Sequence, residues 1–148
     1  MIGRSWLPFD RLSLRELYSV LALRQKVFVV EQKCLYLDAD SYDPQCWHGM
    51  GIVETGLVAC CRIVPPGLMY AEPAIGRVAT ANEVRGQGIG RALMLEAIDQ
   101  TKRLYPGQGI RLGAQRYLEH FYTSLGFTTA GAPYDEDGIP HIEMIREG

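Results

Sequence analysis

The sequence predicts a single domain of the α/β (α+β) class that spans residues 1–148. Three observations support this class. Helical and strand-like segments alternate along the whole chain, and the shares of hydrophobic residues (47%) and charged residues (22%) are those of a globular protein. In the middle of the chain, an apolar strand leads through a glycine-rich turn into a helix. A chain of this length can bury a sizeable core without a second domain.

The first part of the chain combines a helix with an acidic loop. Ser13 and Glu16 stand three positions apart as a capping box, and apolar residues follow at helical spacing. These signals predict a helix over residues 14–30, with a break near Arg24. Residues 32–47 are polar and acidic, and we expect them to form a loop.

Strands dominate the middle of the chain. Two strand-like runs, 48–54 and 57–64, flank Thr55-Gly56, which is typical of a tight hairpin. The apolar run 74–80 also has strand length. It leads into a helix over residues 89–105, because apolar residues recur there on one helical face.

The last part of the chain alternates again. Residues 110–114 predict a short strand, and residues 117–125 predict a helix that Gly126 terminates. The remaining expected elements are a strand starting at 127–129, a turn at 134–140 and a closing strand at 141–145.

Composition and charge argue against several classes of function. The net charge of −2 implies no attraction to nucleic acid. No apolar run is long enough to span a membrane and no secretory leader is evident, so we expect a soluble, cytoplasmic protein without membrane partners. The four cysteines include no C-x-x-C pair and the three histidines are far apart, so we expect neither a metal site nor a disulfide framework.

The central motif is the glycine-rich turn over residues 85–91. Glycines at alternate positions leave the backbone bare and permit φ values that other residues resist. The free N–H groups and the dipole of the following helix favour an anion, typically phosphate. Arg85 and Arg91 add positive charge. The turn is therefore a candidate phosphate site, and a glycine-rich turn without a ligand is the alternative.

Three phosphate-binding patterns can be compared with this turn. A Walker loop requires Gly-Lys-Ser/Thr where this chain has Gly90-Arg91-Ala92, and a dinucleotide loop requires glycine at the position of Arg91. The pattern Arg/Gln-x-x-Gly-x-Gly/Ala is met in full by Arg85, Gly88 and Gly90. After a strand and before a helix, this pattern resembles the pyrophosphate loop of the GNAT acyl-CoA N-acyltransferases.

A second motif lies downstream. Phe121-Tyr122-x-x-Leu125-Gly126-Phe127 follows the turn after a helix, a strand and a further helix, which is the order found in that family. Segments 28–32 and 136–144 are similar to those of the ElaA-like subgroup. The resemblance covers nearly the whole chain. It implies a mixed, mostly antiparallel, splayed sheet flanked by helices.

The resemblance also implies acetyl-CoA as the co-substrate, without a metal. The strands ending at Thr80 and starting near Leu112 would splay apart and expose the backbone of Val78, Ala79 and Thr80, with which pantetheine could pair as an added strand. In the turn, the implied cofactor-binding residues are Arg85, Gly86, Gln87, Gly88, Ile89, Gly90 and Arg91.

The implied reaction is direct attack of an amine on the thioester, which makes the chain an N-acetyltransferase. A backbone N–H near Ala79 would stabilise the oxyanion, and Tyr122 would contact the sulfur and act as the general acid. The amine must lose a proton. Glu31, His48 and His141 are the candidate bases, and each could instead hold a loop by hydrogen bonds.

The acidic loop offers a candidate acceptor site. Asp40 and Asp43 would attract a cationic amine and Tyr36 would hold its carbon skeleton, although most acidic loops are simply solvated. The acceptor could be a small molecule or a peptide, and the resemblance allows a homodimer. Two alternatives stay open: a transferase for another acyl chain or acceptor, and a catalytically silent acyl-CoA-binding or sensing module.

Overall fold

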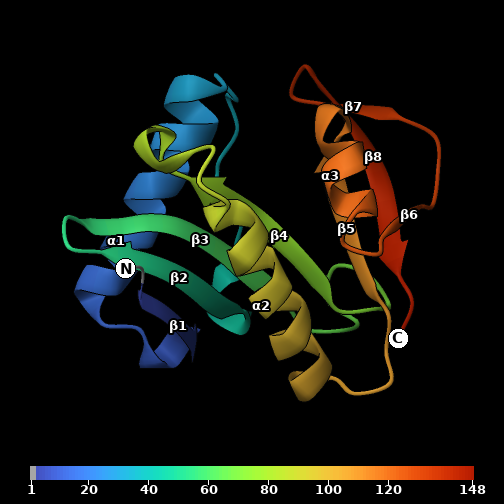
Figure 1. The fold of residues 1–148 in the computed structure, drawn as a ribbon, viewed down its shortest axis with the longest axis horizontal. Coiled ribbons are helices and arrows are strands. Elements are labelled where there is room, and N and C mark those ends of the chain that lie inside the picture. The colour runs from blue at the N-terminus through green and yellow to red at the C-terminus, as the bar shows by residue number, and fades with distance from the viewer. Residues whose placement is uncertain (1–2) are drawn as a thin grey trace.

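The computed structural model describes residues 3–148, which form one sheet with helices on both faces (Figure 1). Within these residues the sheet has eight strands. The strands are β1 (Gly3–Pro8), β2 (Trp47–Val53), β3 (Gly56–Val64), β4 (Ala74–Thr80), β5 (Ile110–Gln115), β6 (Thr128–Thr129), β7 (Tyr134–Glu136) and β8 (Ile139–Arg146). The α-helices are α1 (Leu14–Arg24), α2 (Ile89–Leu104) and α3 (Glu119–Thr123).

The sheet is joined weakly at its centre. Its strand order is β1-β2-β3-β4-β5-β8-β6, with β7 paired to β8. All neighbours are antiparallel except β4 and β5, which run parallel and pair through Ala74 and Arg111. Beyond that pair the two strands diverge, so the sheet opens like a V (Figure 1). This confirms the mixed, mostly antiparallel, splayed sheet that the sequence resemblance implies.

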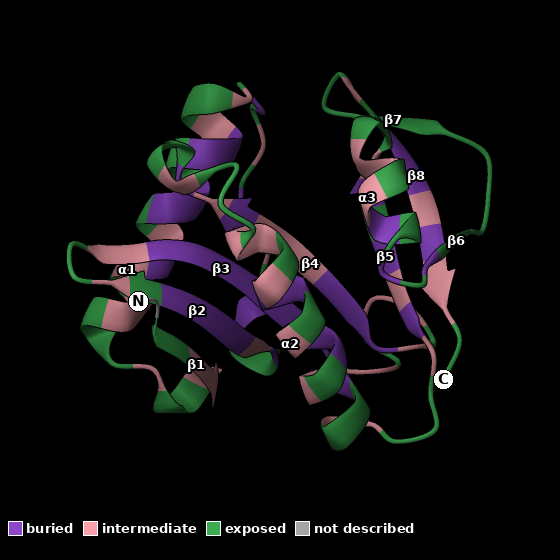
Figure 2. Cartoon of the chain, in the orientation of Figure 1, coloured by how far each residue is buried: buried purple, intermediate pink, exposed green. Residues whose placement is uncertain are grey.

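The two faces of the sheet carry separate cores. Figure 2 shows buried stripes along the central strands and along the sheet-facing sides of the helices. The larger core packs α2 and α3 against one face, with Leu93, Met94 and Phe127 almost fully buried. The smaller core packs α1 against the other face through residues such as Val20. Adjacent Cys60 and Cys61 fall into different cores, as expected from strand alternation.

The expected N-terminal helix changes its winding near Arg24. Its capping box is confirmed, because the Ser13 hydroxyl accepts from the Glu16 N–H (3.0 Å) and the Glu16 carboxylate accepts from the Ser13 N–H (2.8 Å). After α1 the chain continues as a π-helix over Gln25–Glu31. A π-helical turn widens the backbone and is frequent at functional sites. The sequence patterns predict the helical span and the place of the change, but not the π winding.

Two strands form where the sequence patterns predict other structure. β1 forms ahead of the first expected helix, where the sequence patterns predict no strand; it is an edge strand that ends at Pro8, a position where a missing N–H is tolerated. β7 lies inside the expected turn, because Asp137 (φ 51°) and Gly138 (φ 79°) make a tight reversal into β8. The helix expected over residues 117–125 is a 3₁₀ turn, Arg116–Leu118, followed by the shorter α3.

The helices and the metal-ligating side chains bear on the expected membrane and metal contacts. Across residues 3–148, no helix combines the length and the apolar character needed to cross a bilayer. In the same part of the chain, His, Cys, Asp and Glu side chains form no group of three or more arranged to hold a metal ion. The four cysteines are reduced and buried.

Candidate active site

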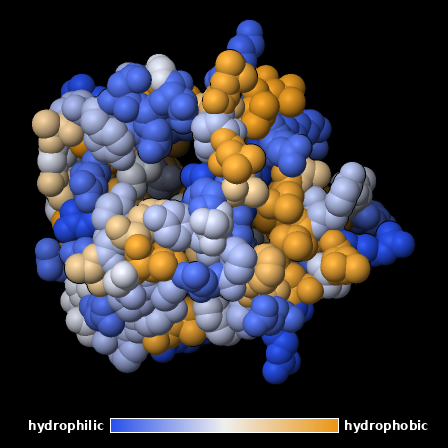
Figure 3. Space-filling view, turned by 180° about the vertical axis from the view of Figure 1, so that it is seen from behind, coloured by the Kyte–Doolittle hydropathy of each residue, from blue (hydrophilic) through white to orange (hydrophobic). Residues whose placement is uncertain are grey.

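A cavity of about 700 Å³ fills the opening between β4 and β5. Seen from behind, the molecular surface is hollowed between the two parts of the sheet (Figure 3). We call the side built from the π-helix, residues 34–42, β3 and β4 the N-terminal wall. The side built from β5, α3 and the β7–β8 hairpin is the C-terminal wall. The volume suits a small-molecule site.

The exposed edge of β4 contains a β-bulge. Arg77 adopts a left-handed conformation (φ 47°), and Arg77 and Val78 together oppose one residue of β3. The Ala81 N–H donates to the Val58 carbonyl (2.8 Å), whereas the Thr80 carbonyl accepts from Arg85 instead of β3. Because backbone groups alternate along a strand, the Val78 and Thr80 N–H groups face the opening and that of Ala79 faces β3. The N–H groups that face the opening are therefore those of the two neighbours of Ala79, and an oxyanion role near Ala79 stays a prediction.

The glycine-rich turn joins this edge to α2. Gly86 (φ 82°) and Gly88 (φ 77°) occupy left-handed conformations that glycine adopts without strain. Gly88 is the N-cap of α2 and offers no side-chain oxygen to the first N–H groups of the helix. Those groups are left for an external acceptor, and a negatively charged one is favoured. Gly90 lines the cavity, so the helix terminus reaches it.

The remaining side chains of the turn are held from several directions. Arg85 donates to the Thr80 carbonyl (2.8 Å) and to the Glu31 carboxylate (2.8 Å), which ties the π-helix to the turn. Arg91 donates to the Ser124 hydroxyl (2.9 Å), Gln87 is exposed, and Ile89 packs on the larger core. Glu31, expected as a base, is therefore the ion-pair partner of Arg85.

Tyr122 reaches the cavity from α3. It is 7% exposed and packs edge-on against Phe121 and Phe127. Burial raises the pKa of the Tyr122 phenol well above its ordinary value, so the hydroxyl keeps its proton at neutral pH. A buried, protonated phenol on the cavity surface can serve as a proton donor.

The acidic loop is bound by arginines from three elements. Arg24 contacts Asp38 and Asp43 (both 2.8 Å), and Arg62 contacts Asp40 (2.6 Å) and Asp43 (2.9 Å). Arg77 completes this cluster with contacts to Asp38 (2.9 Å) and Asp40 (3.1 Å).

This Arg–Asp cluster already pairs the aspartates that are expected to attract an acceptor amine, and the acceptor role of the loop stays a prediction. Burial alone would raise the pKa of Asp40, but hydrogen bonds and charge from Arg62 outweigh it and lower the pKa to about 2. Asp43 lies outside the cavity lining, and Tyr36 lines the cavity beneath the guanidinium of Arg77 (5.3 Å to the ring centroid). Asp40 and Asp43 are thus ionised and already neutralised by protein cations.

The two candidate histidines occupy different environments. His48 lies on β2, is 1% exposed, and has Nε2 2.9 Å from the Asp43 carbonyl; it does not line the cavity. Burial lowers the pKa of His48. His141 lies on β8 and lines the cavity, with Nδ1 2.8 Å from the Ile139 carbonyl and Nε2 3.4 Å from the Glu136 carboxylate.

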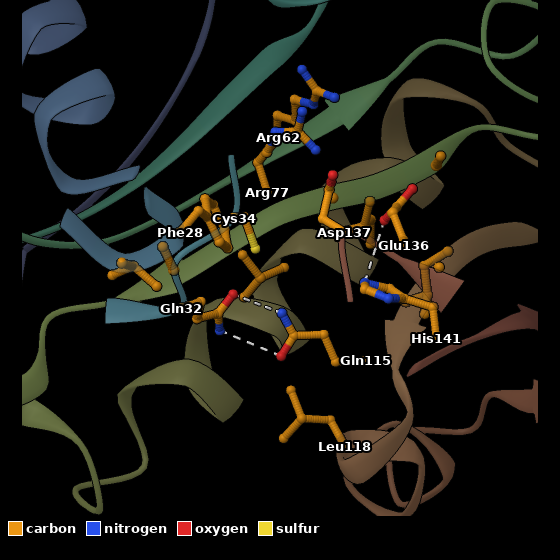
Figure 4. Close-up of a pocket in the computed structure, with 18 of the residues that line it drawn as sticks. Phe28, Gln32, Cys34, Arg62, Arg77, Gln115, Leu118, Glu136, Asp137 and His141 are labelled. Atoms are coloured by element: carbon orange, nitrogen blue, oxygen red, sulfur yellow. Dashed lines mark hydrogen bonds and ion pairs between the residues drawn. The ribbon is translucent and has the colours of Figure 1, made fainter. Parts of the chain in front are cut away.

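Two side-chain pairs in the cavity were not predicted from sequence patterns (Figure 4). Gln115 Nε2 donates to Gln32 Oε1 (2.9 Å), and this amide pair bridges the two walls. Glu136 reaches His141 across the hairpin. The Asp137-Gly138 dipeptide is the signal that could have placed the second pair, because it predicts the hairpin that brings these residues together.

Comparisons with known proteins agree with this architecture. A family model described as an acetyltransferase (GNAT) domain matches residues 60–147. The chain is 46% identical to the UPF0039 protein sll0451 of Synechocystis, over 97% of this chain and 94% of that protein. It is 40% identical to Protein ElaA of Escherichia coli, over 99% of this chain and 97% of that protein.

Solved structures show the same similarity in three dimensions. The crystal structure of E. coli ElaA superposes with a TM-score of 0.94 at 39% identity, covering 99% of this chain and 100% of that one. An acyl-CoA N-acyltransferase from Pseudomonas aeruginosa superposes with a TM-score of 0.95 at 37% identity, covering 99% of both chains. Sequence and structure together show that this chain belongs to the GNAT acetyltransferase family, among the relatives of ElaA.

Proposed function

We propose that the protein is an acetyl-CoA-dependent N-acetyltransferase that transfers an acyl group directly to an amine. The observation that carries this proposal is the meeting, on one cavity, of the unpaired β4 edge and the uncapped N-terminus of α2. Extended amides fit the first and a pyrophosphate fits the second. An aminoglycoside 6′-N-acetyltransferase complexed with coenzyme A shares the fold (TM-score 0.72, 16% identity).

Two groups of backbone atoms would bind the cofactor. The N–H groups of Gln87, Gly88, Gly90 and Arg91 would hold the pyrophosphate, with Arg85 beside them. The open backbone of Val78 and Thr80 would align the pantetheine. The bound donor supplies an acyl group activated as a thioester, so no protein nucleophile is required.

The cavity also offers groups for the chemistry. The Val78 N–H faces the opening and would stabilise negative charge on the acyl oxygen. Tyr122 would deliver its proton to the leaving sulfur. Because its phenol is protonated at neutral pH, it needs no prior activation.

The test is the substitution Gly88→Glu. Its side chain would bring bulk and negative charge to the uncapped helix terminus. We expect wild type to gain thermal stability with coenzyme A, by mass action, and to release thiol from acetyl-CoA with one of a panel of polyamines, amino acids, aminoglycosides and peptides. Gly88→Glu should lose both effects.

Gly107→Glu is the matched control. Gly107 follows α2 at its other end, has a similar φ (79°), and has open space around its missing Cβ, as Gly88 does. Both variants should therefore carry the same backbone strain. Equal stabilisation of wild type and Gly88→Glu by coenzyme A would remove the turn from the binding site. Binding without any thiol release would instead identify a silent acyl-CoA-binding module.

A further inference from the structure

The proposed reaction leaves one proton without an acceptor. An attacking amine must shed a proton to a base or to water. Among the expected bases, Glu31 is the partner of Arg85, and His48 lies outside the cavity. Asp40 lines the cavity but is held by Arg62 and Arg77. His141 combines access to the cavity with a nitrogen that no arginine competes for.

We propose that His141 is the general base of this acyl transfer and that Glu136 stabilises its protonated form. This role rests on the proposed function. It assigns a catalytic residue, His141, and a positioning residue, Glu136, to the C-terminal wall.

The tautomer of His141 follows from its backbone contact. Nδ1 lies 2.8 Å from the Ile139 carbonyl oxygen, which can only accept a hydrogen bond. Nδ1 therefore carries a hydrogen, and in the neutral ring Nε2 keeps its lone pair. In the close-up view, the ring projects from β8 into the cavity (Figure 4). Nε2 thus lies at the cavity lining beside the Glu136 carboxylate, and at 3.4 Å this contact leaves room for Nε2 to accept a proton from an amine.

Glu136 is placed to favour the proton transfer. Its carboxylate lies 3.4 Å from Nε2 and is 60% exposed, so the pair is a moderate stabiliser and not a permanent buried ion pair. Once Nε2 gains a proton, the carboxylate can accept a charge-assisted hydrogen bond from it. The contact is made across the hairpin, in which Tyr134 pairs with His141 and Glu136 with Ile139.

The ring is also held in place. The ring of Tyr134 stacks on the imidazole with the two ring centroids 5.8 Å apart, and His141 is 8% exposed. Burial raises the pKa of Tyr134 to about 12, so this neighbour is neutral at neutral pH. The register partner of His141 on β5 is the neutral Gln115, and Asp137 also lines the cavity from the hairpin tip. Glu136 is consequently the charge that most directly affects the imidazole.

The proton balance closes with these residues. The amine nitrogen forms a bond to the acyl carbon and gives one proton to His141 Nε2. The carbon–sulfur bond breaks, and the sulfur takes one proton from the Tyr122 hydroxyl. His141 then loses its proton to solvent and Tyr122 regains one, so the enzyme returns to its starting state.

The experiment compares His141→Ala with His120→Ala, which removes an exposed histidine that does not line the cavity. Rates are measured with acetyl-CoA and the best amine of the panel, with and without added imidazole. We expect kcat of His141→Ala to fall roughly 10²-fold and to recover in part with imidazole, because imidazole can replace the missing base. The affinity of His141→Ala for coenzyme A should equal that of wild type, and kcat of His120→Ala should equal that of wild type.

A second measurement determines the tautomer of the His141 imidazole directly. Imidazole ¹⁵N shifts of the wild type should report the hydrogen on Nδ1, and Glu136→Gln should lower kcat without lowering coenzyme A binding. A hydrogen on Nε2, an undiminished rate in His141→Ala, or a fall that imidazole does not rescue would each overturn this role. If wild type acetylates no amine of the panel, the proposed function itself fails, which is a different result.

Discussion

In and behind the N-terminal wall of the cavity, three aspartates and three arginines neutralise one another, whereas on the C-terminal wall the carboxylate of Glu136 lies beside a single histidine. The buried cluster ties α1, the acidic loop, β3 and β4 together. The Glu136–His141 pair is partly exposed and joins only the neighbouring strands β7 and β8. The same residue types therefore serve architecture on one wall and remain available for chemistry on the other.

The reason for the difference is the cost of burying charge. A carboxylate removed from water must be paired, and breaking such a pair leaves an uncompensated charge. The aspartates of the cluster therefore hold Arg77 of the bulge, and the Arg77 guanidinium in turn lies over the ring of Tyr36. Glu136 is 60% exposed and remains in contact with solvent, so it is not committed to a buried ion pair. We expect substitutions on the N-terminal wall to change stability and those on the C-terminal wall to change rate.

The largest effect is expected from Asp43→Asn. Arg24 and Arg62 both donate to Asp43 Oδ1, so this change leaves two buried guanidinium groups short of one negative charge. Loss of one partner from a buried ion pair costs about 3 kcal/mol. Urea denaturation should show this loss in the free energy of unfolding.

Asp137→Asn provides the matched control, because it is the same chemical change at an exposed position of the other wall. Its unfolding free energy should stay within about 0.5 kcal/mol of wild type. Equal stabilities for the two variants would contradict the contrast between the walls.

Local signals predicted the parts of the fold that depend on a few neighbouring residues. The Ser13 capping box and the glycines before α2 have the conformations that their chemistry requires. The sequence patterns predicted an acidic loop that could bind an acceptor amine. They did not predict that Asp43 binds Arg24 and Arg62, which lie nineteen positions before and after it in the sequence. Such a partnership depends on tertiary packing and leaves no local pattern.

The hairpin shows an intermediate case. Its Asp137-Gly138 turn is a recognisable signal, but the flanking residues are mostly polar and exposed, so β7 lacks an apolar alternation. The pairing of Glu136 with His141 follows only after the strand register is known. The splay between β4 and β5, in contrast, came from the family resemblance and not from any property of those two strands alone.

An intermediate effect is expected from Tyr122→Phe, on the C-terminal side. The change keeps the ring and its edge-on contacts with Phe121 and Phe127 and removes only the hydroxyl. We expect kcat to fall roughly 10²-fold, which is about 2.7 kcal/mol, with coenzyme A affinity and melting temperature little changed. Because burial raises the pKa of Tyr122, wild type should lose no activity through ionisation of this phenol up to pH about 10.

The test requires that chemistry limits the rate, so single-turnover measurements are needed. A Phe variant that reacts as fast as wild type would make Tyr122 a packing residue and assign the sulfur's proton to water. If the melting temperature falls together with the rate, the Tyr122 hydroxyl stabilises the fold. That result would contradict the expectation that substitutions on the C-terminal wall change the rate and not the stability.

The smallest effect is expected from His48→Gln, which belongs to the N-terminal side. Burial lowers the pKa of His48 in the folded protein, despite the favourable contact with the Asp43 carbonyl, whereas the unfolded chain has the ordinary value of 6.5. The neutral ring therefore stabilises the fold fully above pH 6.5, and this contribution is lost as the pH falls below that value. A Gln amide can donate to the same carbonyl and does not titrate, so the variant should lose less stability than wild type between pH about 6.5 and about 5.5.

Urea denaturation of both proteins at these pH values measures the difference in the free energy of unfolding. The kcat values of the two proteins at neutral pH should match because the ring lies outside the cavity. If both proteins lose stability in parallel while the variant loses activity, His48 acts in the reaction and the N-terminal wall is not purely architectural.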